Sequence, residues 1–98
     1  MPTPKIRKLG REVRRDLRDR FEVRLRDLAT RLLGDPLEGD DVVAGAFSAL
    51  RRANADVVES QGAEVYLTED VIDRCIRRFG VNARRAEAAA APGRGRAA

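Results

Sequence analysis

The stretch REVRRDLRDRFEVRLRDLATRLLGDP, residues 11–36, decides the fold class. Apolar residues recur through it, and just before it, at steps of three or four, which places them on one stripe of a helix. These residues are Ile6, Leu9, Val13, Leu17, Phe21, Leu25, Leu28 and Leu32. Glycine suits the position just past a helix end and proline cannot continue a helix, so Gly34 and Pro36 mark its end. The pattern predicts a helix from Arg11 to Leu33 whose apolar stripe needs a partner.

Two further helices are predicted downstream. Asp40 or Asp41 can cap a second helix that ends near Gln61 and Gly62. Its apolar positions keep helical spacing and are Val42, Val43, Ala46, Phe47, Leu50, Ala53, Val57 and Val58. A brief extended run, Val65-Tyr66-Leu67, follows, and Thr68-Glu69-Asp70 then opens a third helix that ends at Gly80. The prediction is an all-α fold with a long N-terminal helix, a central helix and a short C-terminal helix.

The length of 98 residues predicts one domain at most. We expect residues 1–5 to form a tail, residues 6–80 the helical domain, and residues 81–98 a basic helix extension followed by a disordered tail. No stretch resembles a signal peptide or a span of about 20 apolar residues, which predicts a cytoplasmic protein.

Residues that carry common catalytic or metal chemistry are scarce. The chain has no histidine and one cysteine, Cys75, which lies in an apolar helical pattern and is expected to be a buried structural thiol. Asp40 and Asp41 are adjacent acids at a helix start, where capping is far commoner than metal binding. We therefore expect no enzyme activity, no catalytic residue, no metal, no cofactor and no small-molecule substrate.

Charge is unevenly distributed along the chain. Residues 1–34 carry eleven basic and five acidic side chains, residues 35–80 carry five and ten, and residues 81–98 carry four and one. Basic segments attract nucleic acid, because neutralising phosphates releases counterions, although a merely solvated helix face has the same composition. The charge pattern therefore makes both ends of the chain candidates for DNA binding.

The order of predicted elements from residue 22 to residue 80 resembles the histone fold in its compact prokaryotic form. In that family the central helix ends at a glycine, an extended loop follows, and an aspartate eight residues on opens the last helix. Gly62, the run Val65-Tyr66-Leu67 and Asp70 match this order, and Arg77-Arg78-Phe79 matches the end of the last helix. Three features depart from the family. The first helix is far longer than the family's short one, which indicates an added N-terminal extension from Lys5 to Arg20. Ala63-Glu64-Val65 stands where an Arg-Lys-Thr type sequence usually binds phosphate, and the first loop, residues 34–41, is acidic.

The resemblance implies an intertwined homodimer in which the central helices cross. The implied dimer interface consists of Val43, Phe47, Leu50, Val57 and Val58. It also implies a nucleoid-associated protein that binds DNA without reading sequence, through its N-terminal extension and its tail. The predicted nucleic-acid-binding residues are Lys5, Arg7, Lys8, Arg11, Arg14, Arg15, Arg18, Arg84, Arg85, Arg94 and Arg96.

Two alternatives remain open. The first is a helical interaction module in which the N-terminal stripe packs against itself or another protein and the arginines only solubilise it. The second is a small transcription regulator that uses residues 68–79 as a recognition helix, with Arg74, Arg77 and Arg78 facing a DNA groove. Binding to unrelated DNA sequences, to one operator or to no DNA would separate the three hypotheses.

Overall fold

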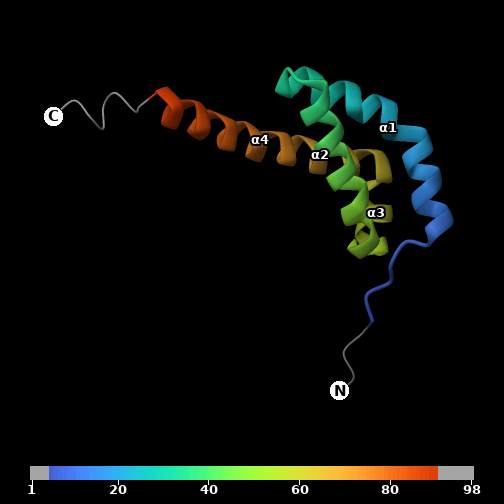
Figure 1. Cartoon of the computed structure of the whole chain (residues 1–98). Helices are drawn as coiled ribbons and strands as arrows, with labels where there is room; N and C mark the ends of the chain where they lie inside the picture. The colour runs from blue at the N-terminus through green and yellow to red at the C-terminus, as the bar shows by residue number, and fades with distance from the viewer. Residues whose placement is uncertain (1–4, 91–98) are drawn as a thin grey trace.

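The computed structural model describes residues 5–90, and within them the chain forms four α-helices, a short 3-10 turn and no β-strand (Figure 1). The elements in chain order are α1 (Arg11–Leu33), α2 (Pro36–Ala49), η1 (Leu50–Arg52), α3 (Ala55–Gln61) and α4 (Ala63–Ala90). The all-α prediction is confirmed. Helices α1 and α2 form an antiparallel hairpin, and α4 packs against both before it runs on beyond them.

Helix α1 has the predicted bounds. Gly34 adopts the left-handed conformation (φ 73°) and its N–H donates to the carbonyl of Thr30 at 2.7 Å, which ends the helix. The middle of the predicted stripe is buried at Leu17 and Leu25, together with Ala29. Steps of four residues turn the stripe by about 40° each time, and Val13 and Leu32 are exposed. Leu9, which precedes the helix, is buried. The stripe packs against α2 and α4 of the same chain.

Helix α2 begins earlier than predicted, because Asp35 caps it. The Asp35 carboxylate accepts a hydrogen bond from the N–H of Leu37 at 2.8 Å, and Pro36 occupies the first helical position. The prediction that Asp40 or Asp41 caps the helix is therefore wrong. Both acids lie inside the helix and form ion pairs with other elements.

The hairpin closes tightly where Gly39 of α2 meets Thr30 of α1. A β-carbon added at Gly39 would lie 2.7 Å from the Thr30 hydroxyl oxygen and 2.9 Å from its backbone nitrogen. The close approach of the two helices therefore depends on a glycine at this position.

The predicted central helix is broken between Leu50 and Asn54. After η1, Ala53 is extended and the Asn54 side chain accepts a hydrogen bond from the N–H of Asp56 at 2.9 Å, which starts α3. The N-terminal segment packs along this break, since the N–H of Ala55 donates to the carbonyl of Arg7 at 2.8 Å. The asparagine cap and the pairing with the N-terminal segment satisfy backbone groups that a continuous helix would otherwise use.

The extended run Val65-Tyr66-Leu67 and the start of a helix at Thr68 are also wrong. Gly62, with φ 89°, makes the turn alone, and α4 begins at Ala63. Leu67, Val71 and Cys75 follow at four-residue steps and are almost fully buried. The helix then continues through Gly80 to Ala90, so the last helix is long and not short.

A single chain closes its own aliphatic core. Val43, Phe47, Leu50 and Val58, four of the five residues predicted for the dimer interface, are each at most 6% exposed within it. The fifth, Val57, is 46% exposed. Most of the residues predicted to contact a second copy are therefore buried within their own chain.

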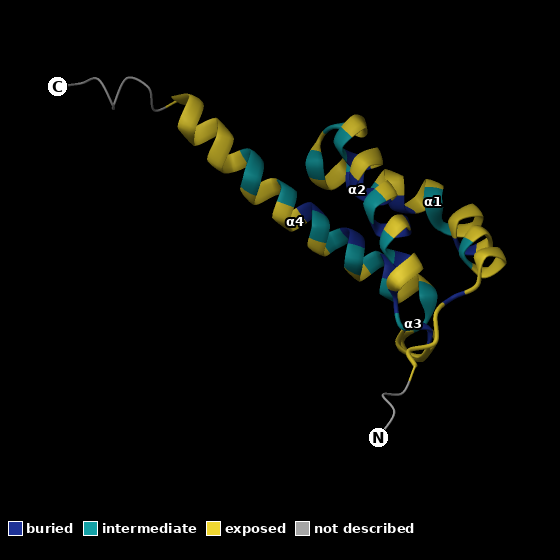
Figure 2. Ribbon diagram, turned by 60° about the horizontal axis from the view of Figure 1, so that its bottom comes forward, coloured by how far each residue is buried: buried dark blue, intermediate teal, exposed yellow. Residues whose placement is uncertain are grey.

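The chain divides into a body and an arm (Figure 2). The body comprises α1, α2, η1, α3 and residues 63–75 of α4, and the arm is residues 76–90 of α4, where no side chain is buried. The radius of gyration is 17.8 Å, against about 13 Å for a compact domain of this length. None of the helices in residues 5–90 has the length and apolar content needed to cross a membrane.

Candidate nucleic-acid interface

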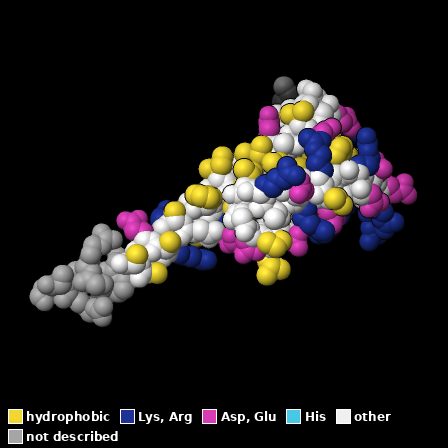
Figure 3. All heavy atoms as spheres, turned by 90° about the horizontal axis from the view of Figure 1, so that it is seen from above, with side chains coloured by type: hydrophobic (Ala, Val, Ile, Leu, Met, Phe, Trp, Pro, Cys, Tyr) yellow, Lys and Arg dark blue, Asp and Glu magenta, His cyan; other side chains and the backbone are white. Residues whose placement is uncertain are grey.

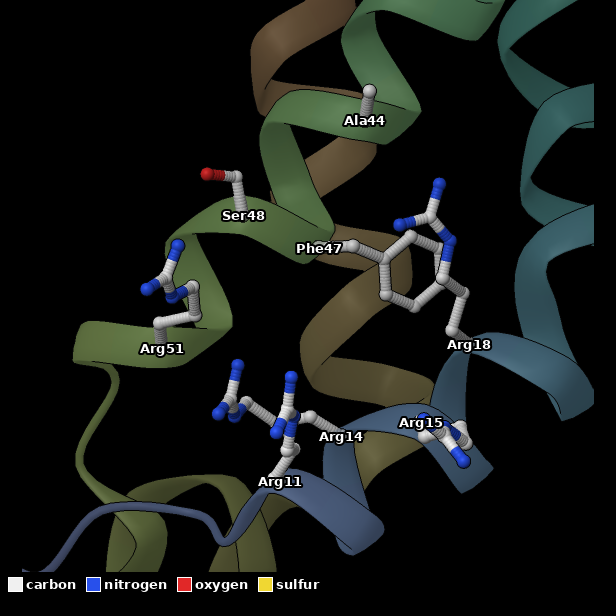
Figure 4. Close-up of a pocket in the computed structure, with 8 residues that line it drawn as sticks. All are labelled: Arg11, Arg14, Arg15, Arg18, Ala44, Phe47, Ser48 and Arg51. Atoms are coloured by element: carbon white, nitrogen blue, oxygen red, sulfur yellow. The ribbon is translucent and has the colours of Figure 1, made fainter.

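A groove between the first half of α1 and the end of α2 is lined by five arginines (Figure 4). Its volume is about 390 Å³. We call it the arginine groove, and its lining residues are Arg11, Arg14, Arg15 and Arg18 from α1, Ala44, Phe47 and Ser48 from α2, and Arg51 from η1. None of them is acidic. The α1 arginines stand at positions i, i+3, i+4 and i+7, which share one helix face.

Most of these arginines have no counter-ion among the residues that the structure describes. Among residues 5–90, only Arg18 of the five has an ion-pair partner, Glu22 at 2.5 Å. The remainder of α1 is different, because Arg20, Arg24, Arg26 and Arg31 each pair with an acidic residue. Like charges gathered without counter-ions create a positive potential that attracts an anion.

Arg14 is the least exposed of the four α1 arginines in the groove. Its Nε atom is buried and, within the described chain, has no hydrogen-bond acceptor. Arg18 lies over the Phe47 ring with 5.7 Å from its guanidinium carbon to the ring centroid, a cation–π contact that positions it at the groove wall.

A second depression, between α2 and α4, shows the opposite arrangement. It is lined in part by Arg74, Arg77 and Arg78, the residues of the hypothetical recognition helix. Each has an acidic partner: Asp70 at 2.9 Å for Arg74, Asp73 for Arg77, and Asp41 at 2.5 Å for Arg78. The hydrogen bond to Asp41 is also the main cause that raises the pKa of Arg78. These arginines are neutralised within the chain, so the depression has much less attraction for an anion than the arginine groove.

The structure brings together four of the residues predicted to bind nucleic acid and separates the others. Arg7 pairs with Asp56 at 2.9 Å and with Glu59, and these hydrogen bonds, the one to Glu59 first, raise its pKa. Lys5 and Lys8 are exposed on the N-terminal segment, while Arg84 and Arg85 are exposed on the arm. The remaining two, Arg94 and Arg96, lie outside the described residues.

Sequence reasoning missed Arg51, because it lies in the segment whose total charge is acidic. Arg51 and Arg52 line a smaller depression with Ser48 beside the groove. A local signal exists: no acidic residue occurs from Val42 to Ala55, so the pair stands in an acid-free stretch of 14 residues. Counting charge over that window, and not over residues 35–80, would have found it.

Cys75 is the only cysteine and lies in the core of the body. Burial raises the pKa of its thiol, and the nearby positive charge of Arg78 lowers it by less. A protonated, buried thiol is a poor nucleophile. The structure places no other nucleophile or acid beside it in the core, since all buried side chains among residues 5–90 are hydrophobic.

Comparisons with protein-family models, with curated proteins and with solved structures gave no match to this chain.

Proposed function

We propose that this protein binds double-stranded DNA without sequence preference, through phosphate contacts in the arginine groove. The observation that carries the proposal is a groove with five arginines, four of which lack an ion-pair partner among residues 5–90. Guanidinium groups bind phosphate oxygens through paired N–H donors, and exposed arginines gain affinity by releasing counterions from DNA.

The spacing of the arginines suits a phosphate backbone. Arg11 and Arg18 are separated by about 10 Å along α1. Successive phosphates of one DNA strand advance about 3.4 Å along the duplex axis and are farther apart along the strand itself, so the groove has room for about two of them. Arg51 contributes from the opposite wall, which lets the groove hold the backbone from two sides.

The lining of the groove favours a duplex over a single strand. Its one aromatic ring, Phe47, is 6% exposed and covered by Arg18, so it offers no surface on which a single-stranded base could stack. It contains no asparagine or glutamine, the side chains that read adenine most often, but arginine binds guanine as well as phosphate. A comparison of two unrelated duplexes therefore separates phosphate binding from base recognition.

An architectural role as a homodimer, as in prokaryotic histones, extends this proposal. The intertwined strap dimer itself remains a hypothesis. Forming it would require Val43, Phe47, Leu50 and Val58 to leave the core of their own chain and be buried again by a second copy.

The test is fluorescence anisotropy with two unrelated DNA duplexes over a salt series. The groove variant is the triple substitution Arg11→Gln, Arg15→Gln and Arg51→Gln, at three exposed positions. Its matched control is Arg20→Gln, Arg24→Gln and Arg31→Gln, which removes the same charge from paired arginines outside the groove. We expect equal affinity for both duplexes and a loss of roughly 10- to 100-fold in the groove variant only. The log–log salt slope should become shallower by about 3.

Three outcomes would overturn the proposal. Equal losses in the groove variant and the control would mean that net charge, and not the groove, attracts DNA. No binding by the unmodified chain, even at low salt, would favour the interaction module. Tight binding to one sequence over the other would favour a regulator.

A further inference from the structure

Helix α4 carries a second apolar stripe that is separate from the one in the core. We call it the α4 seam, and its residues are Val65, Ile72, Ile76, Phe79, Ala83, Ala86 and Ala90. Val65, Ile76 and Phe79 are 49%, 65% and 60% exposed, and the three alanines are exposed too. From Ile72 onward the steps alternate between four and three residues, which is the repeat of a two-helix coiled coil.

The seam lies on a different side of α4 from the core. Leu67, Val71 and Cys75 face the body, and each residue turns the helix by about 100°, so Ile72 points roughly a quarter turn away from Val71. Hydrophobic side chains follow α4 outward from the body in the space-filling view (Figure 3). No element within residues 5–90 buries Ile76 or Phe79, although exposed aliphatic and aromatic side chains in a row mark interaction surfaces.

We propose that the α4 seam is the contact between two copies of this chain, packed with their α4 helices antiparallel. An antiparallel register that sets Ile76 against Phe79 also sets Ile72 against Ala83, and Val65 against Ala90. The bulky side chains of each seam then fill the space beside Ala83 and Ala90 of the other, while Ala86 lies opposite Glu69. A parallel pair would instead set alanine against alanine beyond Phe79 and leave that end underpacked.

The charge of α4 also favours the antiparallel arrangement. Residues 63–73 contain four acids and no base, whereas residues 74–90 contain five arginines and one acid. Most of these charges already pair within the chain, and among residues 5–90 the ones left without an ion-pair partner are Glu69 in the first part and Arg84, Arg85 and Glu87 in the second. An antiparallel pair brings Glu69 of each helix towards Arg84 and Arg85 of the other, whereas a parallel pair would bring the arginines of the two copies together, which is destabilising.

The geometry of such a dimer separates the two bodies. Each arm would lie along α4 of the other copy. This contact would cover the seam side chains that are exposed in the single chain. No seam residue lines the arginine groove, so this inference does not rest on the proposed function. Loss of self-association and loss of DNA binding are therefore separate outcomes.

The first test is the molar mass of the full-length protein by light scattering over a concentration series. We expect twice the chain mass of 10.9 kDa for the unmodified protein and a single chain mass for the double variant Ile76→Glu and Phe79→Glu. The control is Val23→Glu and Leu37→Glu, which changes two hydrophobic residues of the body that are 75% and 78% exposed. It should remain a dimer. Circular dichroism checks that all variants stay helical.

The second test fixes the orientation by disulfide cross-linking in a Cys75→Ala background. In the antiparallel pair, Ile72→Cys lies opposite Ala83→Cys of the other copy, so a mixture of the two single variants should give mixed disulfide dimers. In a parallel pair each variant would cross-link with itself. A monomeric unmodified protein, a double variant that stays dimeric, a control that dissociates, or self-linked disulfides would each overturn the proposal.

Discussion

The two halves of α4 have similar apolar patterns in sequence and opposite surroundings in the structure. In the body, Leu67 and Val71 are fully buried, whereas Ile76 and Phe79 on the arm are mostly exposed. Both pairs follow helical spacing and would be assigned to a core by periodicity alone. Periodicity shows that a helix face is apolar, but a second element must be present to bury it.

Truncating a body residue should have the largest effect. Leu50 is 1% exposed, so Leu50→Ala leaves a cavity and should lower the free energy of unfolding by about 2–5 kcal/mol. Ile76→Ala on the arm should change it by less than about 0.5 kcal/mol when measured in protein dilute enough to be monomeric. Urea titration followed by circular dichroism measures both. A similar loss in the two variants would mean that the arm is packed in the monomer.

Replacing a glycine with alanine should lower the stability of the chain in the body and raise it on the arm. Gly39→Ala forces a methyl group against Thr30 and should destabilise the chain by about 1–3 kcal/mol. Gly80→Ala on the arm meets no atom within 4 Å and should stabilise the helix by up to about 1 kcal/mol, because alanine prefers the helix. Thermal unfolding of both variants tests this contrast, and a stabilising Gly39→Ala would contradict the close approach of α1 and α2.

The ion pair between the body and the arm should contribute less to the free energy of unfolding than a residue of the core does. Arg78 on the arm pairs with Asp41 of α2 at 2.5 Å, and Arg77, one position earlier, pairs only within α4. Partly exposed ion pairs contribute about 0.2–1 kcal/mol, so Arg78→Gln should lower stability by that amount at low salt and by less at high salt. Arg77→Gln is the control. Equal effects of the two substitutions would show that α4 and α2 are not coupled by charge.

The smallest effect concerns Cys75, the last buried residue before the arm. Because burial raises the pKa of its thiol, the folded chain keeps the proton at pH values where the unfolded chain has lost it. Stability is therefore fully present below the ordinary thiol pKa of 9.0 and falls as the pH rises above it. Unfolding of the natural chain and of Cys75→Ala, compared between pH 7 and pH 10, should show a steeper fall for the natural chain. Parallel pH profiles would contradict the prediction.

Local sequence signals predicted the elements whose ends depend on one residue. Gly34 ends α1 where expected, because left-handed backbone is easiest for glycine. The same kind of signal gave a wrong prediction at Thr68-Glu69-Asp70, which has the composition of a helix start but lies inside α4. The competing signal was the four-residue spacing of Ala63, Leu67, Val71 and Cys75, which crosses the supposed loop.

The arginine groove was predicted in part. Four of its arginines share one face of α1, so helical spacing alone groups them, and they belong to the predicted set. Arg7 was assigned the same role from its charge, but its partners Asp56 and Glu59 lie about 50 positions away in sequence. Arg51 lines the groove only because α2 folds back along α1 and brings the following turn, η1, beside it. Pairing and proximity over such separations are invisible to a local pattern.

The sequence by itself determined that this protein is helical, where its first helix begins and ends, and that its first 34 residues are strongly basic, because these properties depend on neighbours within a few positions. Tertiary structure decided which arginines are neutralised and which are left facing a groove. It also decided which apolar stripe fills the core and which remains on the arm. Electrostatic attraction and burial both act between side chains that are close in space, and only the packing of α1, α2 and α4 sets those distances.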